Sequence, residues 1–257
     1  NNNIKMIDLY IKFKEADSFD HRSAIIGLNY YNEFISELKE RGLIKGYDFS
    51  FKYTIPMEDK GELIIGDLPH IYDDTNYDEK NLRTAKLINE PMIEWSLNFD
   101  VLIIKNHENK NVYHLEIDEK ALFLIEEFFI TGSNKYLNYI EENFFQKYIH
   151  QNICRKRIHH KAYYDEIFFH IICDIENEKN RKEFFDVFPE LILYQKEMNY
   201  NFTLDAKDLF TIIPDGKRFL FNVDFMMNSN KWTLGKPFFK KYQLLYLIDN
   251  KVQKINF

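Results

Sequence analysis

The sequence predicts a mostly β protein with few short helices. Of its 257 residues, 24 are Phe and 17 are Tyr, and aromatic side chains favour strands and large interior contacts. Several segments alternate apolar and polar residues, most clearly residues 95–100 and 219–225, as strands with one buried face do. Because 45% of the residues are hydrophobic, the chain has enough material for one large all-β domain or two smaller ones.

Charge and polarity exclude several classes of protein. A formal net charge of -7 argues against broad nucleic-acid binding, since a phosphate-binding surface is basic. The basic segment 155–161 has no interleaved aromatic residues for base stacking, so we expect it to form a solvated loop. No run of about 18 apolar residues occurs, and we expect no transmembrane segment. The polar start does not resemble a signal peptide, which indicates a cytosolic chain or a mature or partial product.

The first third of the chain predicts four strands and one helix. The expected strands are residues 4–13, 23–28, 47–53 and 61–66. The expected helix spans residues 32–41, with Asn32 as its N-cap and Gly42 at its C-terminal stop. The polar stretch 73–87 follows, and we interpret it as a connection between two parts of the fold.

The rest of the chain predicts a longer series of strands and one long helix. The expected strands are residues 94–106, 112–117, 163–174, 188–194, 200–204, 219–225, 244–248 and 252–257. The helix spans residues 134–150 and carries an apolar stripe at helical spacing, formed by Leu137, Ile140, Phe144 and Tyr148.

The segment 120–134, K-A-L-F-L-I-E-E-F-F-I-T-G-S-N, resembles the second catalytic loop of pepsin-like aspartic proteases. In that family a buried strand ends in Asp-Thr-Gly and continues through two apolar residues to a glycine turn and a helix. When the two are aligned on Gly132, the family's aspartate falls at Leu124, and its Thr and Gly fall at Ile125 and Glu126. All three residues of the signature are therefore replaced.

Other segments extend this resemblance over residues 23–257. The most specific is W-T-L-G-K-P-F-F-K-K-Y at residues 232–242, followed by an apolar strand, an Asp-Asn turn and a short closing strand. In the family an apolar-apolar-Gly element threads beside each catalytic loop, and here the matching residues are Ile25, Ile26 and Gly27, and Thr233, Leu234 and Gly235. Residues 61–72, 188–194 and 200–210 are similar to further family strands and hairpins.

The resemblance implies a pepsin-like bilobal acid-protease fold. We expect residues 1–85 to form an incomplete N-terminal lobe, and residues 86–257 a fuller C-terminal lobe. The first residues correspond to a point after the family's first Asp-Thr-Gly, so we expect half of the N-terminal lobe to be missing. The abundance of Asn, Lys and Phe is similar to that of ciliate members, and the family implies a secretory, vacuolar, lysosomal or extracellular location.

The residues at the replaced loop do not support aspartic-protease chemistry, which needs two carboxylates that share a proton around a water molecule. Leu124 cannot activate water, and we interpret Glu126 and Glu127 as solvated residues rather than acids with a raised pKa. His159 and His160 are adjacent and have no third ligand at a suitable spacing, so we expect no metal. No catalytic residue and no cofactor site are predicted.

Two features bear on the cellular compartment. Cys154 and Cys173 lie at the ends of a segment that reads as a loop followed by a strand, so a hairpin would bring them together. A disulfide there would be worth about 3 kcal/mol and would place the protein in an oxidising compartment. The alternative is two buried free thiols in a cytosolic protein. Asn201 begins the glycosylation sequon Asn-Phe-Thr.

The sequence therefore favours a catalytically inactive aspartic-protease-like protein that acts as a binding or structural component. We expect a protein partner, and the remainder of the chain's own precursor is one candidate. The alternative is a fragment of an active aspartic endopeptidase whose catalytic Asp lies on a missing upstream segment.

Overall fold

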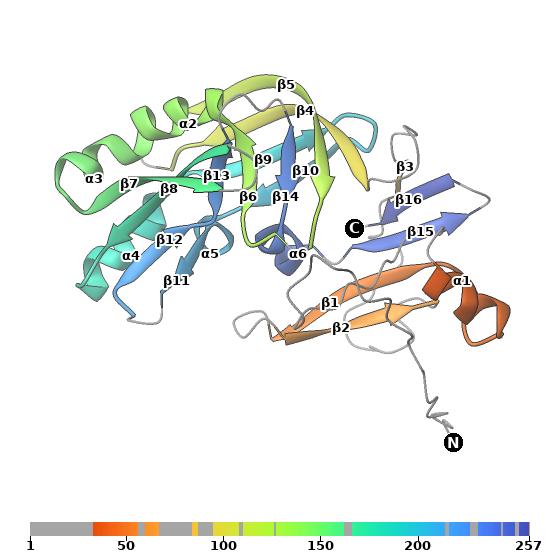
Figure 1. Ribbon diagram of the computed structural model, residues 1–257. Coiled ribbons are helices and arrows are strands. Elements are labelled where there is room, and N and C mark those ends of the chain that lie inside the picture. The colour runs from red at the N-terminus through yellow and green to blue at the C-terminus, as the bar shows by residue number, and fades with distance from the viewer. Residues whose placement is uncertain are drawn as a thin grey trace.

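The computed structural model describes most of the chain after residue 32 and confirms a mostly β protein with few short helices (Figure 1). The described residues are 33–55, 60–66, 84–86, 95–107, 110–125, 127–161, 166–213, 216–226, 231–242, 244–249 and 252–256. The predicted strands 4–13 and 23–28 lie outside these ranges, and so do Ile25, Ile26 and Gly27. The predicted helix near residue 32 is confirmed as α1 (Glu33–Glu40).

The described residues form two sheets, and the smaller one joins strands from residues 49–86 with strands from residues 245–256. Its strand order is β2-β1-β15-β16-β3, and every pairing in it is antiparallel. The strands are β1 (Phe49–Ile55), β2 (Lys60–Ile65), β3 (Thr84–Lys86), β15 (Leu245–Asp249) and β16 (Val252–Asn256). The predicted boundary between lobes falls inside β3, and the division into lobes stays a prediction.

Aromatic side chains pack the smaller sheet against the rest of the fold. Phe49 stacks on Tyr246 with ring centroids 4.6 Å apart, and Trp95 meets both rings edge-on. Phe51 contacts Phe239 edge-to-face. Such pairs contribute beyond simple area burial, so this cluster fixes β1 against the C-terminal strands.

Among the described residues, the larger sheet has eleven strands, and its path is β10-β9-β4-β5-β14-β6-β13-β8-β12-β11, with β7 paired to β8. Its strands are β4 (Ser96–Lys105), β5 (Val112–Phe123), β6 (Ile130–Ser133), β7 (Cys154–Lys161), β8 (Glu166–Asp174), β9 (Glu190–Gln195), β10 (Tyr200–Leu204), β11 (Phe210–Ile212), β12 (Arg218–Phe221), β13 (Val223–Met226) and β14 (Trp232–Leu234). The sheet is mixed, since β6 pairs with β13 and β5 with β14 in parallel.

Helices cover parts of the larger sheet (Figure 1). The predicted long helix is confirmed as a continuous helical segment, formed by α2 (Asn134–Ile140), the π-helical turn η4 (Glu141–Phe145) and α3 (Gln146–His150). The others are α4 (Glu178–Val187), α5 (Ala206–Leu209) and α6 (Lys236–Lys241). Phe144, Phe184, Phe188 and Phe210 meet between the helical segment, α4 and β11, and form part of one continuous core.

A disulfide closes the hairpin of β7 and β8. Cys154 and Cys173 face each other across the two strands and are bonded, and both residues are buried. The predicted pairing is therefore confirmed, and the alternative of two free thiols is wrong. The bond is compatible with a secreted or lumenal protein.

Two predictions of local structure were wrong. The basic segment from Arg155 onward is not a loop but strand β7, which pairs with the buried strand β8. Its exposed, basic side chains gave no apolar alternation that would indicate a strand. The expected single strand 219–225 is broken at Asn222. There the side-chain amide donates to the Asp208 carbonyl and the backbone N–H donates to the Leu209 carbonyl. β12 and β13 both pair with β8, but on their other side β12 pairs with β11 and β13 with β6.

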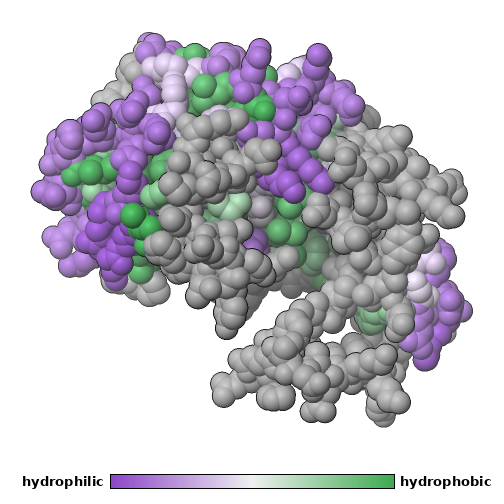
Figure 2. All heavy atoms as spheres, turned by 45° about the horizontal axis from the view of Figure 1, so that its top comes forward, coloured by the Kyte–Doolittle hydropathy of each residue, from purple (hydrophilic) through white to green (hydrophobic). Residues whose placement is uncertain are grey.

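The described surface is largely hydrophilic on the face in Figure 2, with hydrophobic patches that are small and separate. The large apolar side chains that are exposed come from different elements: Leu43, Leu63, Val112, Phe128, Ile158 and Ile212. Among the described residues, no helix is long and apolar enough to cross a membrane.

Candidate functional site

The loop between β5 and β6 is built around a strand from the far end of the chain. β14 lies between the two, parallel to β5 and antiparallel to β6. Thr233 sits at the centre of this arrangement, opposite Leu122 on one side and Thr131 on the other. The structure therefore brings the predicted Thr233-Leu234-Gly235 element directly beside the predicted loop at Leu124.

Backbone hydrogen bonds fix the loop to β14 and α6. The Leu124 N–H donates to the Leu234 carbonyl at 3.1 Å, and the Lys236 N–H donates to the Glu127 carbonyl at 2.8 Å. Within the loop, the Glu127 N–H donates to the Leu124 carbonyl at 3.1 Å. Glu126 lies outside the described residues.

Gly235 is required where β14 meets the loop. A Cβ atom at this position would overlap the carbonyl oxygens of Phe129 and Glu127, the second at 2.5 Å. Since real Cβ atoms do not approach backbone this closely, only glycine fits without moving the loop. Because the two backbones are this close, the Glu127 carbonyl can accept a hydrogen bond from the Lys236 N–H of α6.

Trp232 anchors the N-terminal end of β14, opposite the end at which Gly235 follows. Its indole N–H donates to Glu119 Oε2 at 2.9 Å, and both side chains are buried. Gly132 on β6 leaves room for the indole, because a Cβ there would lie 2.7 Å from the ring. Tyr136 covers the indole, with ring centroids 5.5 Å apart. This anchor was not predicted as a functional contact, although Trp232 begins the most specific family segment.

The loop's own side chains are mainly apolar. Leu124 and Ile125 are half-buried, and Ile125 packs against the core. Phe128 is 64% exposed, with the Lys236 ammonium 4.0 Å from the centre of its ring. Glu127 is the one described carboxylate among residues 124–129. The loop therefore presents an apolar surface with one flanking cation–π contact.

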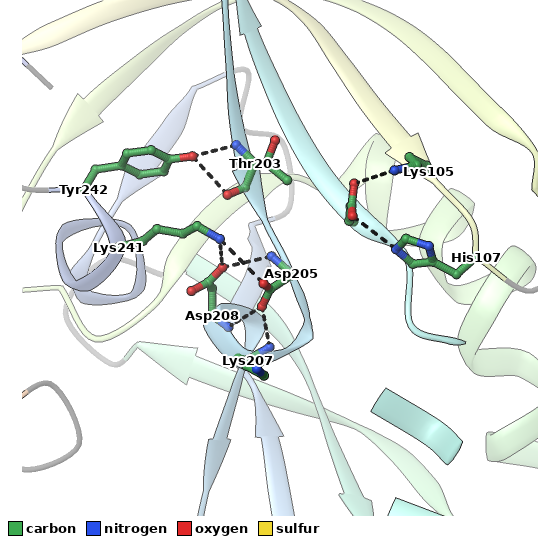
Figure 3. A network of polar contacts seen from close by, with 9 residues as sticks. Lys105, His107, Thr203, Asp205, Lys207, Asp208, Lys241 and Tyr242 are labelled. Atoms are coloured by element: carbon green, nitrogen blue, oxygen red, sulfur yellow. Dashed lines mark hydrogen bonds and ion pairs between the residues drawn. The ribbon is translucent and has the colours of Figure 1, made fainter. Parts of the chain in front are cut away.

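A polar network joins β10, α5 and α6 (Figure 3). The Tyr242 hydroxyl donates to the Thr203 carbonyl at 3.0 Å and accepts from the Thr203 N–H at 2.7 Å. Asp205 and Asp208 form a capping box at the start of α5, and Lys241 forms ion pairs with both. Desolvation by burial raises the pKa of the Tyr242 hydroxyl above its usual range.

The network was missed at the level of sequence, although Asp205-x-x-Asp208 before a short helix is a capping pattern. Instead, residues 200–210 were expected to continue as a hairpin, and α5 occupies part of that segment. The network stabilises the turn between β10 and β11. It contains no nucleophile with an adjacent base, so we assign it a structural role.

Asp208 should make stability depend on pH. Desolvation by burial raises its pKa above the ordinary value of 3.8, against the lowering effect of the bond from Lys241. A raised carboxyl pKa in the folded state favours the protonated form, so its contribution to stability is present below pH 3.8 and is lost as pH rises through the raised value.

We expect this loss to be absent in Asp208→Asn. Urea unfolding from pH 3 to 7 should show the wild type losing stability relative to the variant as pH rises. Asp186→Asn removes an exposed carboxylate on α4 and serves as the control. The assignment would be contradicted if the free energy of unfolding of the wild type, relative to that of Asp208→Asn, stayed constant or rose with pH.

Titratable groups elsewhere do not assemble into a metal centre within the part of the chain that the structure describes. The adjacent His159 and His160 lie in β7, and their side chains are outside the described set. His107 and Lys105 both contact the Glu190 carboxylate, at 3.3 and 3.2 Å, in a surface contact (Figure 3). Such surface contacts contribute little to stability.

Comparison with known proteins identifies no family. No protein-family model and no curated protein matches the chain.

Proposed function

We propose that the chain is a catalytically inactive relative of pepsin-like aspartic proteases that acts as a binding or structural component of an assembly. The observation that carries the proposal is the position of Leu124 in the threaded loop. Its N–H donates to the Leu234 carbonyl at the end of β14. The family resemblance places a catalytic aspartate at the position of Leu124. A leucine at this point retains the backbone arrangement without the carboxylate.

The chemistry of the loop supports inactivity. Peptide hydrolysis by this class of enzyme needs two carboxylates that share a proton, and leucine can neither hold that proton nor polarise a water. Ile125 has no hydroxyl to bond across the loop. Glu127 lies three positions after Leu124, and its backbone carbonyl accepts a hydrogen bond from the Lys236 N–H. We therefore expect no peptidase activity.

The bilobal organisation is part of the proposal. The larger sheet is built from residues 96–234, whereas the smaller sheet combines strands before residue 87 with strands after residue 244. An incomplete N-terminal lobe over residues 1–85 and a fuller C-terminal lobe over residues 86–257 would then share the smaller sheet.

A binding role is supported by the exposed surface of the loop. Phe128 is a large aromatic residue that is 64% exposed on a loop fixed by backbone hydrogen bonds. Exposed aromatic residues on rigid backbone are favourable anchors for a protein partner. The disulfide agrees with a partner met in the secretory pathway or outside the cell.

Inactivity is tested with the purified chain and a mixture of defined peptides incubated from pH 2 to 7. We expect no cleavage, and no binding of a statine-containing transition-state analogue by calorimetry. Restoring the signature with Leu124→Asp, Ile125→Thr and Glu126→Gly should not create cleavage in this chain alone. Acid-dependent cleavage by the wild type that the analogue inhibits would overturn the proposal and favour the alternative of an enzyme fragment.

The assembly role is tested by purifying the native protein under mild, non-reducing conditions and measuring its mass in solution. We expect a complex of fixed stoichiometry, with crosslinks near Phe128 identified by mass spectrometry. Phe128→Ser should weaken the complex, while Ile212→Ser, which changes an exposed apolar residue on β11, should not. A protein that is always a monomer would contradict the assembly role.

A further inference from the structure

The sequon Asn201-Phe202-Thr203 lies on β10, the first strand in the path of the larger sheet. In the described sheet, β10 pairs with β9 alone. Phe202 is fully buried in the core, whereas Asn201 points away from it and is exposed. Since side chains alternate along a strand, Asn201 and Thr203 share the outer face of the sheet.

The outer face beside Asn201 is partly apolar. Asn201 lies opposite Tyr194 on β9, and Tyr194 lies opposite Val101 on β4. Both neighbours are half-buried. The Tyr194 hydroxyl donates to Asn199 Oδ1 at 3.1 Å in the turn that joins β9 to β10, which fixes the position of the ring. A group attached to Asn201 would therefore lie next to a fixed aromatic ring, because the Cβ atoms of directly opposed residues in an antiparallel pair are neighbours, about 5 Å apart.

The disulfide supplies an independent observation. The bond between Cys154 and Cys173 indicates an oxidising compartment, which in eukaryotic cells is where asparagine-linked sugars are added. A sequon matters only to a chain that passes through this compartment. The sequon and the disulfide lie in different parts of the larger sheet, so neither feature accounts for the other.

We propose that Asn201 carries an N-linked glycan whose first sugar packs over the Tyr194 ring. In the transfer, Asn201 Nδ2 forms a bond to the sugar of a lipid-diphosphate oligosaccharide. The glycosyl–phosphate bond breaks, the lipid diphosphate leaves and the amide nitrogen loses one proton. The transfer precedes the docking of β10, because the backbone N–H and C=O of Thr203 both bond to the Tyr242 hydroxyl in the folded chain.

The glycan has a physical consequence for the fold. An outer strand of a sheet is a template for pairing with another chain, and proteins protect such edges. A bulky, solvated sugar beside Tyr194 and Val101 covers the partly apolar face and blocks approach to β10. This inference does not depend on the proposed function, since it holds whether or not the chain cleaves peptides.

Site occupancy is tested by secreting the chain from a eukaryotic cell behind a signal peptide. We expect a mass shift that peptide-N-glycosidase removes, converting Asn201 to aspartate. Asn201→Gln and Thr203→Ala should both abolish the shift, while Thr203→Ser, which keeps the sequon, should retain it. Disulfide-bonded protein in which the Asn201 peptide is wholly unmodified would overturn the proposal.

The contact with Tyr194 is tested by thermal unfolding before and after enzymatic removal of the glycan. We expect removal to lower the Tm of the wild type and of Tyr194→Phe, which keeps the ring but loses the bond to Asn199. In Tyr194→Ser, removal should change the Tm little. Equal shifts in all three proteins would overturn the packing of the sugar on the ring.

Discussion

Replacing Gly235 with alanine should cause one of the largest losses of stability that a single methyl group can produce in this chain. The added Cβ would overlap the carbonyl oxygens of Glu127 and Phe129, and backbone atoms cannot rotate away as a side chain does. Overpacking of this kind costs about 1–3 kcal/mol, and we expect the upper end of that range. Urea unfolding measures the loss directly.

The matched control is Gly216→Ala. Gly216 has a φ of 69°, and no other group lies within 4 Å of the position that a Cβ would take. Alanine there is therefore strained only by its backbone conformation, at about 1–2 kcal/mol. Gly235 has a φ of -94°, so its replacement tests steric overlap alone.

Hydrogen exchange adds a local readout to this comparison. The N–H groups of Leu124 and Lys236 should exchange faster in Gly235→Ala and not in Gly216→Ala, because both groups bond within the threaded arrangement of loop, β14 and α6. An equal loss of stability in both variants, with no change at the loop, would contradict that arrangement.

Much of the secondary structure could be predicted because it depends on local periodicity. Trp95, Leu97 and Phe99 alternate with polar residues up to Asp100 where β4 begins, and the stripe from Leu137 to Tyr148 forms the long helical segment. The pairing of Cys154 with Cys173 was also predictable, since a short hairpin brings the two ends of one segment together. In each case the determining contacts lie close in sequence.

Features that depend on distant contacts could not be predicted in the same way. β7 is basic and exposed, and it becomes a strand only because β8 pairs with it. The helix α4 was not predicted, because its polar sequence buries little more than Phe184. The insertion of β14 between β5 and β6 joins residues more than a hundred positions apart, and only the family resemblance indicated that these segments meet.

The same distinction holds for the candidate site. The replaced residues Leu124 and Ile125 could be named from the sequence, and Gly235 could be placed beside them. The buried bond between Trp232 and Glu119 could not, because nothing in the local sequence of either residue indicates the other. Glu119, whose carboxylate binds the Trp232 indole of β14, therefore lies outside residues 124–126, which align with the family signature.

Removing the disulfide with Cys154→Ala and Cys173→Ala should have a comparably large effect. The bridge joins residues separated by 19 positions, and loss of a loop of this size costs about 3 kcal/mol through the greater entropy of the unfolded chain. The effect should be concentrated in β7, because β8 keeps its pairing with β12 and β13 whereas β7 is described as paired to β8 alone.

Unfolding with and without reductant separates this effect from the loss of packing. Reduced wild type and the double variant should unfold at nearly the same urea concentration, and only the oxidised wild type should respond to reductant. In the reduced wild type and in the double variant, hydrogen exchange should show β7 opening first, while the amides of β4 and β9 stay protected. If reduction left the wild type unchanged, the bridge would not be stabilising the hairpin. A loss as large as expected would instead make the fold depend on an oxidising compartment, which is also the condition for a glycan at Asn201.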